Sequence, residues 1–450
     1  MEHALGLVMI SAAGIALAVW LIAKVGLHPF VGLLTAAMAI GLTAGVAPPD
    51  VATAIEKGFS DILKGTGLVV ALGLGLGAML QISGGAQALA MKVLSLTGQR
   101  YATLGALLAA LLVGLPLFFE TGVVLLMPII VAGVAVMEDR QGLRLRVILS
   151  ALAGLSVLHA LLPPHPGPLI ALRDLQAPLL RTMMLGAVAA VPTALIAGPL
   201  LARYTTRGVV AQEAVLSLPD TTRSVSVGAA AAVLLFPIVL IALGAALPLM
   251  GGMDPHAAAW MHLLAEPPVA LLLANLFGLI MLFGRDVMQQ DLQDEIWSST
   301  VLPAGGMILS IGAGGSLKQV LVSAGLPDVV TQFASVSALS PIIIAWLVAV
   351  AIRVGTGSAT VATITASGIM SGMVAAGGGV GAVVDPSLLV LAIGAGSVFF
   401  SHVNDPGFWL VKSYMGTSTS DTFRTWSMLE TAISVVGLAM VLLLDLMSGG

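Results

Sequence analysis

Cysteine is absent from this 450-residue sequence, and charged residues make up only 9% of it. Without cysteine the chain forms no disulfide, uses no thiolate in catalysis and binds no metal through sulfur. A soluble domain is also excluded, because about a quarter of its residues would be charged, whereas here 58% are hydrophobic and the mean hydropathy is +1.07. This composition is typical of a protein that crosses a membrane several times.

Several motifs of enzymes and nucleotide-binding proteins are missing as well. The sequence has no GxxxxGK(S/T) phosphate loop, which weighs against direct use of ATP. It has neither HExxH nor GxSxG, which weighs against a metalloprotease or a serine hydrolase. No long basic run favours binding to nucleic acid, and the net charge is -4. We therefore expect no enzyme activity, no cofactor and no metal.

Twelve long apolar segments follow one another along the chain. They are 4–22, 28–46, 65–82, 101–137, 147–173, 178–201, 225–248, 266–284, 299–317, 336–374, 386–412 and 427–446. A helix of about 20 residues spans a bilayer, so 101–137 and 336–374 are each too long for one span. Both have a polar, small-residue centre, at 114–122 and 353–361. We predict that each is a re-entrant hairpin with its tip inside the membrane.

The distribution of positive charge supports ten spans with two re-entrant hairpins. With that topology twelve Lys and Arg side chains face one compartment, five face the other, and Arg353 lies within a hairpin. The richer side is expected to be cytoplasmic, which places both termini in the periplasm. The polar stretch 202–224 then forms a cytoplasmic linker.

Three pairs of similar features recur at almost the same offset. The sequences His165-Pro166-Gly167 and Asp405-Pro406-Gly407 interrupt two apolar segments 240 positions apart. The hairpin centres are offset by about 239 positions, and two glycine-rich stretches, beginning at Gly65 and Pro303, by about 238. Glycine-rich apolar segments resemble one another by composition alone, but composition does not explain a shared offset.

These features predict an all-α membrane protein made of two repeats, residues 1–201 and 225–450. Each repeat has five spans, one hairpin and one broken helix, and the odd number of spans inverts one repeat relative to the other. Broken helices in corresponding positions of two halves are the best pointer to a transporter's substrate site. We therefore expect the two hairpin tips and the two breaks to meet near the middle of the membrane.

The tips and breaks contain most of the titratable groups that lie deep in apolar sequence. A charged side chain there costs roughly 2.5–3.5 kcal/mol, so it is expected to face a cavity and to have a function. Glu120 is either a proton carrier or a structural carboxylate that binds free N–H groups of its hairpin. Asp405, with Asn404 and His402, offers groups that bind hydroxyls and exchange a proton, although Asn and Asp also cap helices.

Other polar residues near the breaks leave alternatives open. His159 is either a site residue or bonded to a backbone carbonyl, and Arg353 either neutralises an anionic substrate or anchors its hairpin. Small hydroxyl residues in the second hairpin bind a ligand or hold helices together. The predicted substrate-binding residues are Glu120, Thr121, His165, Thr356, Ser358, Thr360, His402, Asn404 and Asp405. The candidates for proton coupling are Glu120, Asp405 and His165.

Six motifs are long enough to compare with known families. They are GLHPFVGLL from Gly26, GLPLFFETGVVLLMPI from Gly114, HALLPPHPGP from His159, GTGSATVAT from Gly355, FSHVNDPGFWLVK from Phe400 and TWSMLET from Thr425. At these residues the chain resembles the gluconate permease family of proton symporters, within the ion transporter superfamily, over nearly its whole length. The resemblance implies a bacterial inner-membrane importer of gluconate or a related sugar acid, driven by protons. It also implies an elevator-like movement of hairpins and broken helices, in a homodimer.

The motifs do not separate the substrates of that family. Its members also carry other small hydroxylated acids, and some carry D-serine. A D-serine carrier would need an anion for the ammonium group, supplied by Glu120 or Asp405. From a different class, a passive anion channel would use the same apolar helices but could not accumulate its substrate.

Overall fold

The chain is helical throughout most of the part that the computed structural model describes. The described residues are 2–115, 118–135, 141–211, 225–247, 254–336, 339–375 and 384–448. No strand occurs among them, so the predicted all-α class is confirmed.

Each half of the chain contains a long helix followed by a series of shorter ones. The first half consists of α1 (Glu2–Ala23), α2 (Pro29–Thr43), α3 (Pro48–Ile82), α4 (Gly85–Thr97), η1 (Gln99–Tyr101), α5 (Ala102–Gly114), α6 (Phe119–Ala135), α7 (Gln141–Leu161), α8 (Pro166–Asp174), α9 (Leu179–Leu195), η2 (Ile196–Leu200) and α10 (Leu201–Thr205). The second half consists of α11 (Val227–Ala246), α12 (Pro255–Ala265), α13 (Pro267–Phe283), η4 (Gly284–Met288), α14 (Gln290–Ser323), α15 (Leu326–Val336), α16 (Pro341–Thr356), α17 (Ala359–Ala375), α18 (Pro386–Ser397), α19 (Pro406–Met415), α20 (Thr419–Thr422), η5 (Phe423–Ser427) and α21 (Met428–Ser448).

Seven helices of the described part are long and apolar enough to cross a membrane, or up to nine if two bent pairs are each one span. These seven overlap seven of the ten predicted spans. The other three predicted spans correspond to the short helix α2, the second part of the bent helix α3, and the pair of short helices α18 and α19. The chain is therefore a multi-pass membrane protein, while the count of ten spans stays a prediction.

The predicted hairpins correspond to α5 with α6 and to α16 with α17. Only Gly357 and Ser358 separate α16 from α17, and these two helices pack against each other. Between α5 and α6, Pro116 and Leu117 lie outside the described residues. Helix α5 packs mainly along α7 and α4 rather than along α6, so the two hairpins are not alike in their packing.

Both predicted helix breaks are present. Helix α7 ends at Leu161 and α8 begins at Pro166, whereas α18 ends at Ser397 and α19 begins at Pro406. Proline suits the first position of a helix, where the N–H that it lacks would have no partner within the helix. Each break therefore ends on the N-terminus of a new short helix.

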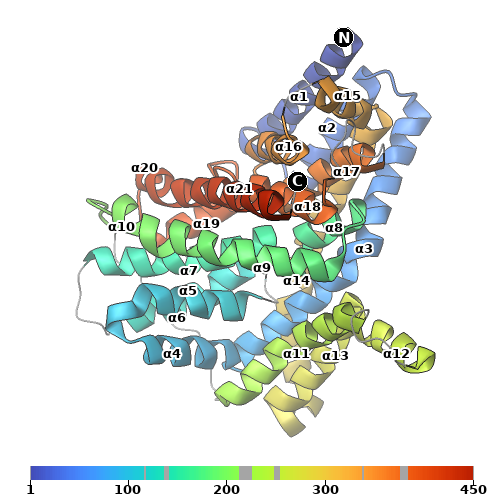
Figure 1. Ribbon diagram of the computed structural model, residues 1–450. Coiled ribbons are helices and arrows are strands. Elements are labelled where there is room, and N and C mark those ends of the chain that lie inside the picture. The colour runs from blue at the N-terminus through green and yellow to red at the C-terminus, as the bar shows by residue number, and fades with distance from the viewer. Residues whose placement is uncertain are drawn as a thin grey trace.

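The two longest helices, α3 and α14, pack against each other along the molecule (Figure 1). Helix α17 packs on α14, and α8 packs on both α3 and α17. The second hairpin and the first broken helix therefore meet beside this long pair. Helices α11, α12 and α13 form a separate group at one edge of Figure 1.

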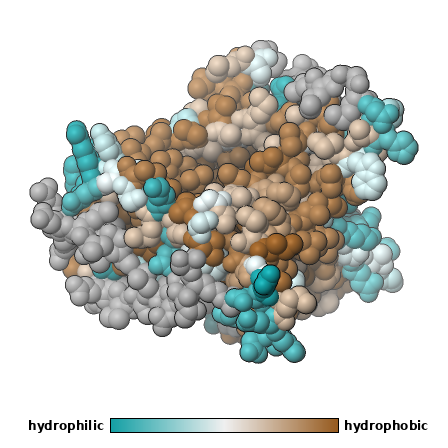
Figure 2. Space-filling model, turned by 90° about the horizontal axis from the view of Figure 1, so that it is seen from below, coloured by the Kyte–Doolittle hydropathy of each residue, from teal (hydrophilic) through white to brown (hydrophobic). Residues whose placement is uncertain are grey.

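The outer surface is largely apolar. Figure 2 shows a face covered mostly by hydrophobic residues, with hydrophilic residues gathered at its margins. Leu68, Ile280 and Val301 are 62–66% exposed on three different helices. Exposed apolar surface of this extent is expected of helices that face lipid.

The two halves pass through their helices in the same order. The long helices α3 and α14 are each followed by a shorter helix, then by the hairpin helices and then by the broken pair, and Pro166 and Pro406 begin matching helices. Helix α10 extends the first half to Thr205, and residues 212–224 of the predicted linker lie outside the described part. The inverted orientation and the division into 1–201, 202–224 and 225–450 stay predictions.

Candidate functional site

A cavity of about 510 Å³ lies between the second hairpin tip, the second break and the start of α6. Side chains from α2, α7, α14 and α21 complete its wall. Seven of the nine predicted binding residues line it, namely Glu120, Thr121, Thr356, Ser358, Thr360, Asn404 and Asp405. A volume of this size is within the range of pockets that bind small molecules.

A buried ion pair closes one side of the cavity. The Arg353 Nη2 atom lies 2.5 Å from the Asp405 Oδ2 atom, and Arg353 is only 3% exposed. The second guanidinium nitrogen, Nη1, donates to the carbonyl of Gly357 at the hairpin tip. Arg353 therefore anchors the tip to the break, and its charge is already paired with a carboxylate.

Asp405 accepts hydrogen bonds from several directions. Its Oδ2 atom also accepts from the hydroxyl of Ser401, and its Oδ1 atom accepts from the N–H of Gly407 at 2.7 Å. The last bond caps the N-terminus of α19. Asp405 gives no hydrogen bond in this arrangement, which is the pattern of an ionised carboxylate.

The hairpin tip and the break touch through their backbones. Gly357 has a φ of +70°, and a Cβ atom there would lie 2.4 Å from the carbonyl oxygen of Asn404. Only glycine satisfies both conditions. The Asn404 amide donates to the carbonyls of Val354 at 3.0 Å and Gly355 at 3.3 Å. Its Oδ1 atom is buried without a partner among the described residues.

The hydroxyl residues of the tip both order the backbone and face the cavity. Ser358 caps α17 by accepting from the N–H of Val361 at 3.3 Å. Thr356 donates to the carbonyl of Ile352 at 2.9 Å. Thr360 is half-buried in the first turn of α17. The tip therefore presents hydroxyls at a helix N-terminus, where backbone N–H groups also point toward the cavity.

Glu120 lies in the first turn of α6 and is exposed to the cavity. No basic side chain of the described residues forms an ion pair with it. Its neighbour Phe119 stacks on Trp426, with 5.4 Å between ring centroids. The start of α6 is thereby held beside the start of α21.

The sequence predicts that His165 and Asp405 occupy corresponding positions in one site, but the structure places the histidines differently. His165 is buried beside a separate void of about 20 Å³ and does not line the main cavity, whereas His159 does. The two rings meet edge-on at 5.8 Å. His402 also lies outside the cavity wall, with its Nε2 atom 3.1 Å from the carbonyl of Val354.

The sequence did not point to several residues of the cavity wall, among them Ser156, Trp426 and Glu430. Ser156 donates to Glu430 Oε1 at 2.5 Å, and both residues are 2% exposed. A carboxylate within the last apolar segment satisfies the same criterion that selected Glu120, so Glu430 could have been found. Ser156 and Trp426 carry no such signal, because neither residue type is unusual in a membrane helix.

The site as a whole suits a polar anion. Helices α6, α17 and α19 begin at its wall, and helix N-termini carry partial positive charge and unpaired N–H groups. Arg353 and Asp405 neutralise each other, so this pair does not cancel the partial positive charge of the helix N-termini. Hydroxyl and amide groups nearby can bond to a ligand rich in hydroxyls.

Comparison with known sequences identifies relatives along nearly the whole chain. The family model described as GntP family permease matches residues 6–447. A gluconate permease of Pseudomonas aeruginosa is 41% identical over 439 residues, covering 95% of this chain and 94% of the relative. The high-affinity gluconate transporter of Escherichia coli K12 is 35% identical, with 97% and 99% covered. The Gnt-II system L-idonate transporter of the same organism is 32% identical, with 97% and 98% covered.

Solved structures of the same fold are also known. The YdaH transporter of Alcanivorax borkumensis superposes with a TM-score of 0.63 at 15% identity, covering 94% of this chain and 98% of that one. MtrF of Neisseria gonorrhoeae gives a TM-score of 0.63 at 14% identity, covering 95% and 97%. At this identity the likeness concerns the fold alone, which is that of a membrane transporter.

Proposed function

Because this chain belongs to the GntP family of permeases, we propose that it is a proton-coupled importer of gluconate or a closely related sugar acid. Relatives named for gluconate and for L-idonate support this class of substrate. The bacterial inner membrane, with both termini in the periplasm, is the location that the charge distribution favours.

The observation that carries the proposal is the meeting of three helix N-termini, with hydroxyl, amide and carboxylate side chains, around a cavity of about 510 Å³. A sugar acid combines one carboxylate with a chain of hydroxyls. Its carboxylate would lie at the start of α17, near Ser358 and Thr360, where the helix end favours an anion. Its hydroxyls would donate to Glu120 and contact Thr121 and Asn404.

Arg353 and Asp405 would then shape the site rather than contact substrate with free charges. Their ion pair holds the second tip to the second break. His402 supports the same junction through the carbonyl of Val354. Removing any of these would displace Asn404, so they act as positioning residues.

Transport would follow an elevator-like movement within a homodimer, in which the hairpins and broken helices move against α3 and α14. A polar contact marks this boundary. Lys318 Nζ on α14 lies 2.6 Å from Asp174 Oδ2 at the end of α8, and the hydroxyl of Ser367 on α17 donates to the same oxygen at 2.6 Å. A movement of α8 and α17 past α14 would have to break the bond to Lys318, whereas the bond to Ser367 joins two helices that move together.

The runner-up is a carrier of D-serine or another small hydroxy acid. D-serine needs a free anion for its ammonium group, and Asp405 is already paired with Arg353. Glu120 alone of the two predicted anions is open to the cavity without an ion pair. Glu120 is thus available to an ammonium group, and the preference for a sugar acid rests on the relatives named for gluconate and L-idonate.

Purified protein offers a direct test of substrate class. A ligand that binds only the folded state raises the unfolding temperature by mass action. We expect gluconate and related aldonates to raise it in a panel that also contains uronates and D-serine. In proteoliposomes, a pH gradient should drive gluconate to a higher concentration inside than outside. A response to D-serine alone would contradict the sugar-acid assignment, and equilibration without accumulation would indicate a channel.

A further inference from the structure

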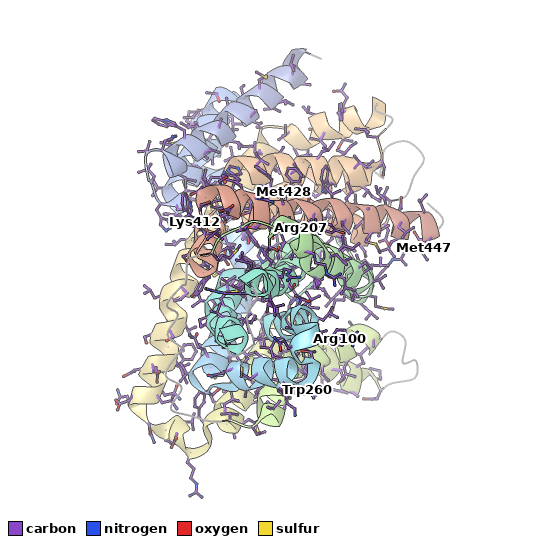
Figure 3. The ribbon with its side chains drawn as sticks, turned by 90° about the vertical axis from the view of Figure 1, so that its left-hand side faces the viewer. Arg100, Arg207, Trp260, Lys412, Met428 and Met447 are labelled. Atoms are coloured by element: carbon purple, nitrogen blue, oxygen red, sulfur yellow. The ribbon has the colours of Figure 1, made fainter. Side chains whose placement is uncertain are left out.

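Glu430 is a buried acidic residue in the first turn of α21, 2% exposed, that lines the substrate cavity. Figure 3 shows α21 running from Met428 to Met447, with Lys412 of α19 beside its Met428 end. Glu430 therefore lies at the end of α21 where α19 and the second break are located. Trp426, one turn earlier, connects this end of α21 to Ser401 through its Nε1–H at 2.8 Å.

The surroundings of Glu430 provide few partners for a negative charge. The hydroxyl of Ser156 on α7 donates to its Oε1 atom at 2.5 Å. Among the described residues, no Lys, Arg or His nitrogen lies within ion-pair distance of this carboxyl group. The charged or titratable side chains that share the cavity with it are His28, Glu120, His159, Arg353 and Asp405.

Hydrogen-bonding capacity distinguishes Glu430 from Asp405. An ionised carboxylate accepts several hydrogen bonds, and leaving it buried with few of them is costly. Asp405 has a guanidinium, a hydroxyl and a backbone N–H as donors, whereas Glu430 has one hydroxyl. A neutral carboxyl group needs fewer donors than a carboxylate, and the single donor at Glu430 is the hydroxyl of Ser156. The donors around Asp405 suit an ionised carboxylate, whereas the single donor at Glu430 suits a protonated carboxyl group.

We infer that Glu430 is the residue that carries the coupled proton, with Ser156 as its positioning partner. The inference rests on the proposed function. A proton from periplasmic water forms an O–H bond at Glu430, which removes one negative charge from the cavity wall and favours entry of the anionic substrate. Once the site opens to the cytoplasm and the substrate leaves, the O–H bond breaks and the proton passes to water. Binding of proton and substrate is thus mutually favourable, as linkage requires.

Glu120 has the other role in this scheme. Its side chain is exposed, so water solvates its charge when no substrate is bound. It is also at the cavity side of α6, where it can accept hydrogen bonds from substrate hydroxyls. Glu120 therefore determines affinity for the polyol part of the substrate, and Glu430 determines coupling.

The full-length protein with Glu430→Gln, reconstituted in liposomes, tests the inference. Glutamine can still bond to Ser156 but cannot release a proton. We expect loss of gluconate accumulation driven by a pH gradient, with exchange of labelled for unlabelled gluconate retained. Binding of gluconate, followed by thermal shift, should lose its dependence on pH. Asp445→Asn, the same change near the other end of α21, should leave accumulation as in the unmodified protein.

The outcomes separate the two proposals. If Glu430→Gln accumulates gluconate like the unmodified protein, the inference is overturned while sugar-acid transport stands. If Glu120→Gln abolishes accumulation and Glu430→Gln does not, Glu120 is the carrier. Failure of the unmodified protein to bind gluconate would instead remove the proposed function. Should Glu430→Gln not fold, Glu430→Asp and Ser156→Ala decide: both should accumulate gluconate with a shifted pH dependence, and an unchanged pH dependence would contradict the inference.

Discussion

The two helix breaks share the residues Pro-Gly after a titratable side chain, yet their surroundings have little in common. At the second break Asp405 caps α19 and pairs with Arg353. At the first break His165 makes no side-chain cap bond with α8. The Nε2 atom of His165 is buried without a partner in the described part of the chain. One break is fixed by charge and capping, and the other by packing.

This difference locates the chemistry of the site. The second break lines the cavity directly, through Asn404 and Asp405, whereas the first contributes through the helix that precedes it. Ser156 and His159 on α7 reach the cavity, and His165 lies behind them. Two helix breaks with similar sequences therefore need not contribute equivalent residues to one site.

Removing the positive charge that pairs with Asp405 at the second break should have the largest effect. Arg353→Ala leaves Asp405 buried without its partner, and breaking a buried pair in this way costs about 3–5 kcal/mol. We expect a marked fall in the unfolding temperature and loss of uptake. The double variant Arg353→Ala with Asp405→Ala should recover part of the stability but not the uptake. Equal stability of Arg353→Ala and the unmodified protein would show that the pair does not hold the tip to the break.

Changing the contact between tip and break should come next. Gly357→Ala places a Cβ atom 2.4 Å from the Asn404 carbonyl, in a backbone region that costs a non-glycine residue about 1–3 kcal/mol. We expect gluconate binding to weaken, measured by thermal shift, because Asn404 is displaced. Gly305→Ala on α14, where a Cβ atom would meet nothing within 4 Å, is the matched control. Similar binding by both variants would argue against a close tip-to-break contact.

A smaller effect is expected at the far end of the first broken helix. Asp174→Asn weakens the contacts of α8 with Lys318 and Ser367, and loss of such a charged hydrogen bond costs about 1–3 kcal/mol. Since the bond to Lys318 joins α8 to α14, we expect the transport rate to change more than the binding affinity. Asp50→Asn, at an exposed position of α3, is the control. A change in affinity without a change in rate would oppose the proposed sliding boundary.

Substitution at the first break itself should have the smallest effect. His165→Asn is expected to lower uptake by less than about tenfold, which corresponds to roughly 1.4 kcal/mol, because His165 does not line the main cavity. The pH dependence of uptake should stay that of the unmodified protein. Loss of pH dependence would restore His165 as a proton carrier and make the two breaks chemically equivalent.

Much of the fold could be predicted because each feature depends on local sequence. Apolar runs near 20 residues give spans, and Pro166 and Pro406 begin helices because proline suits the first helical position. Seven of the predicted binding residues line one cavity, and their role in binding stays a prediction. The packing of α5 along α7 was not predictable, because an apolar helix in lipid has no polar face to show which side turns inward.

By itself the sequence determined that the chain spans a membrane, where its helices break, and which polar residues lie near those breaks. The tertiary structure alone decided which of these residues meet. Arg353 and Asp405 are 52 positions apart, and Ser156 and Glu430 are 274 apart. Such pairs depend on how the helices rotate about their axes and pack. In this chain the inward and lipid-facing surfaces are both apolar, so no periodic pattern in the sequence shows which face of a helix turns inward.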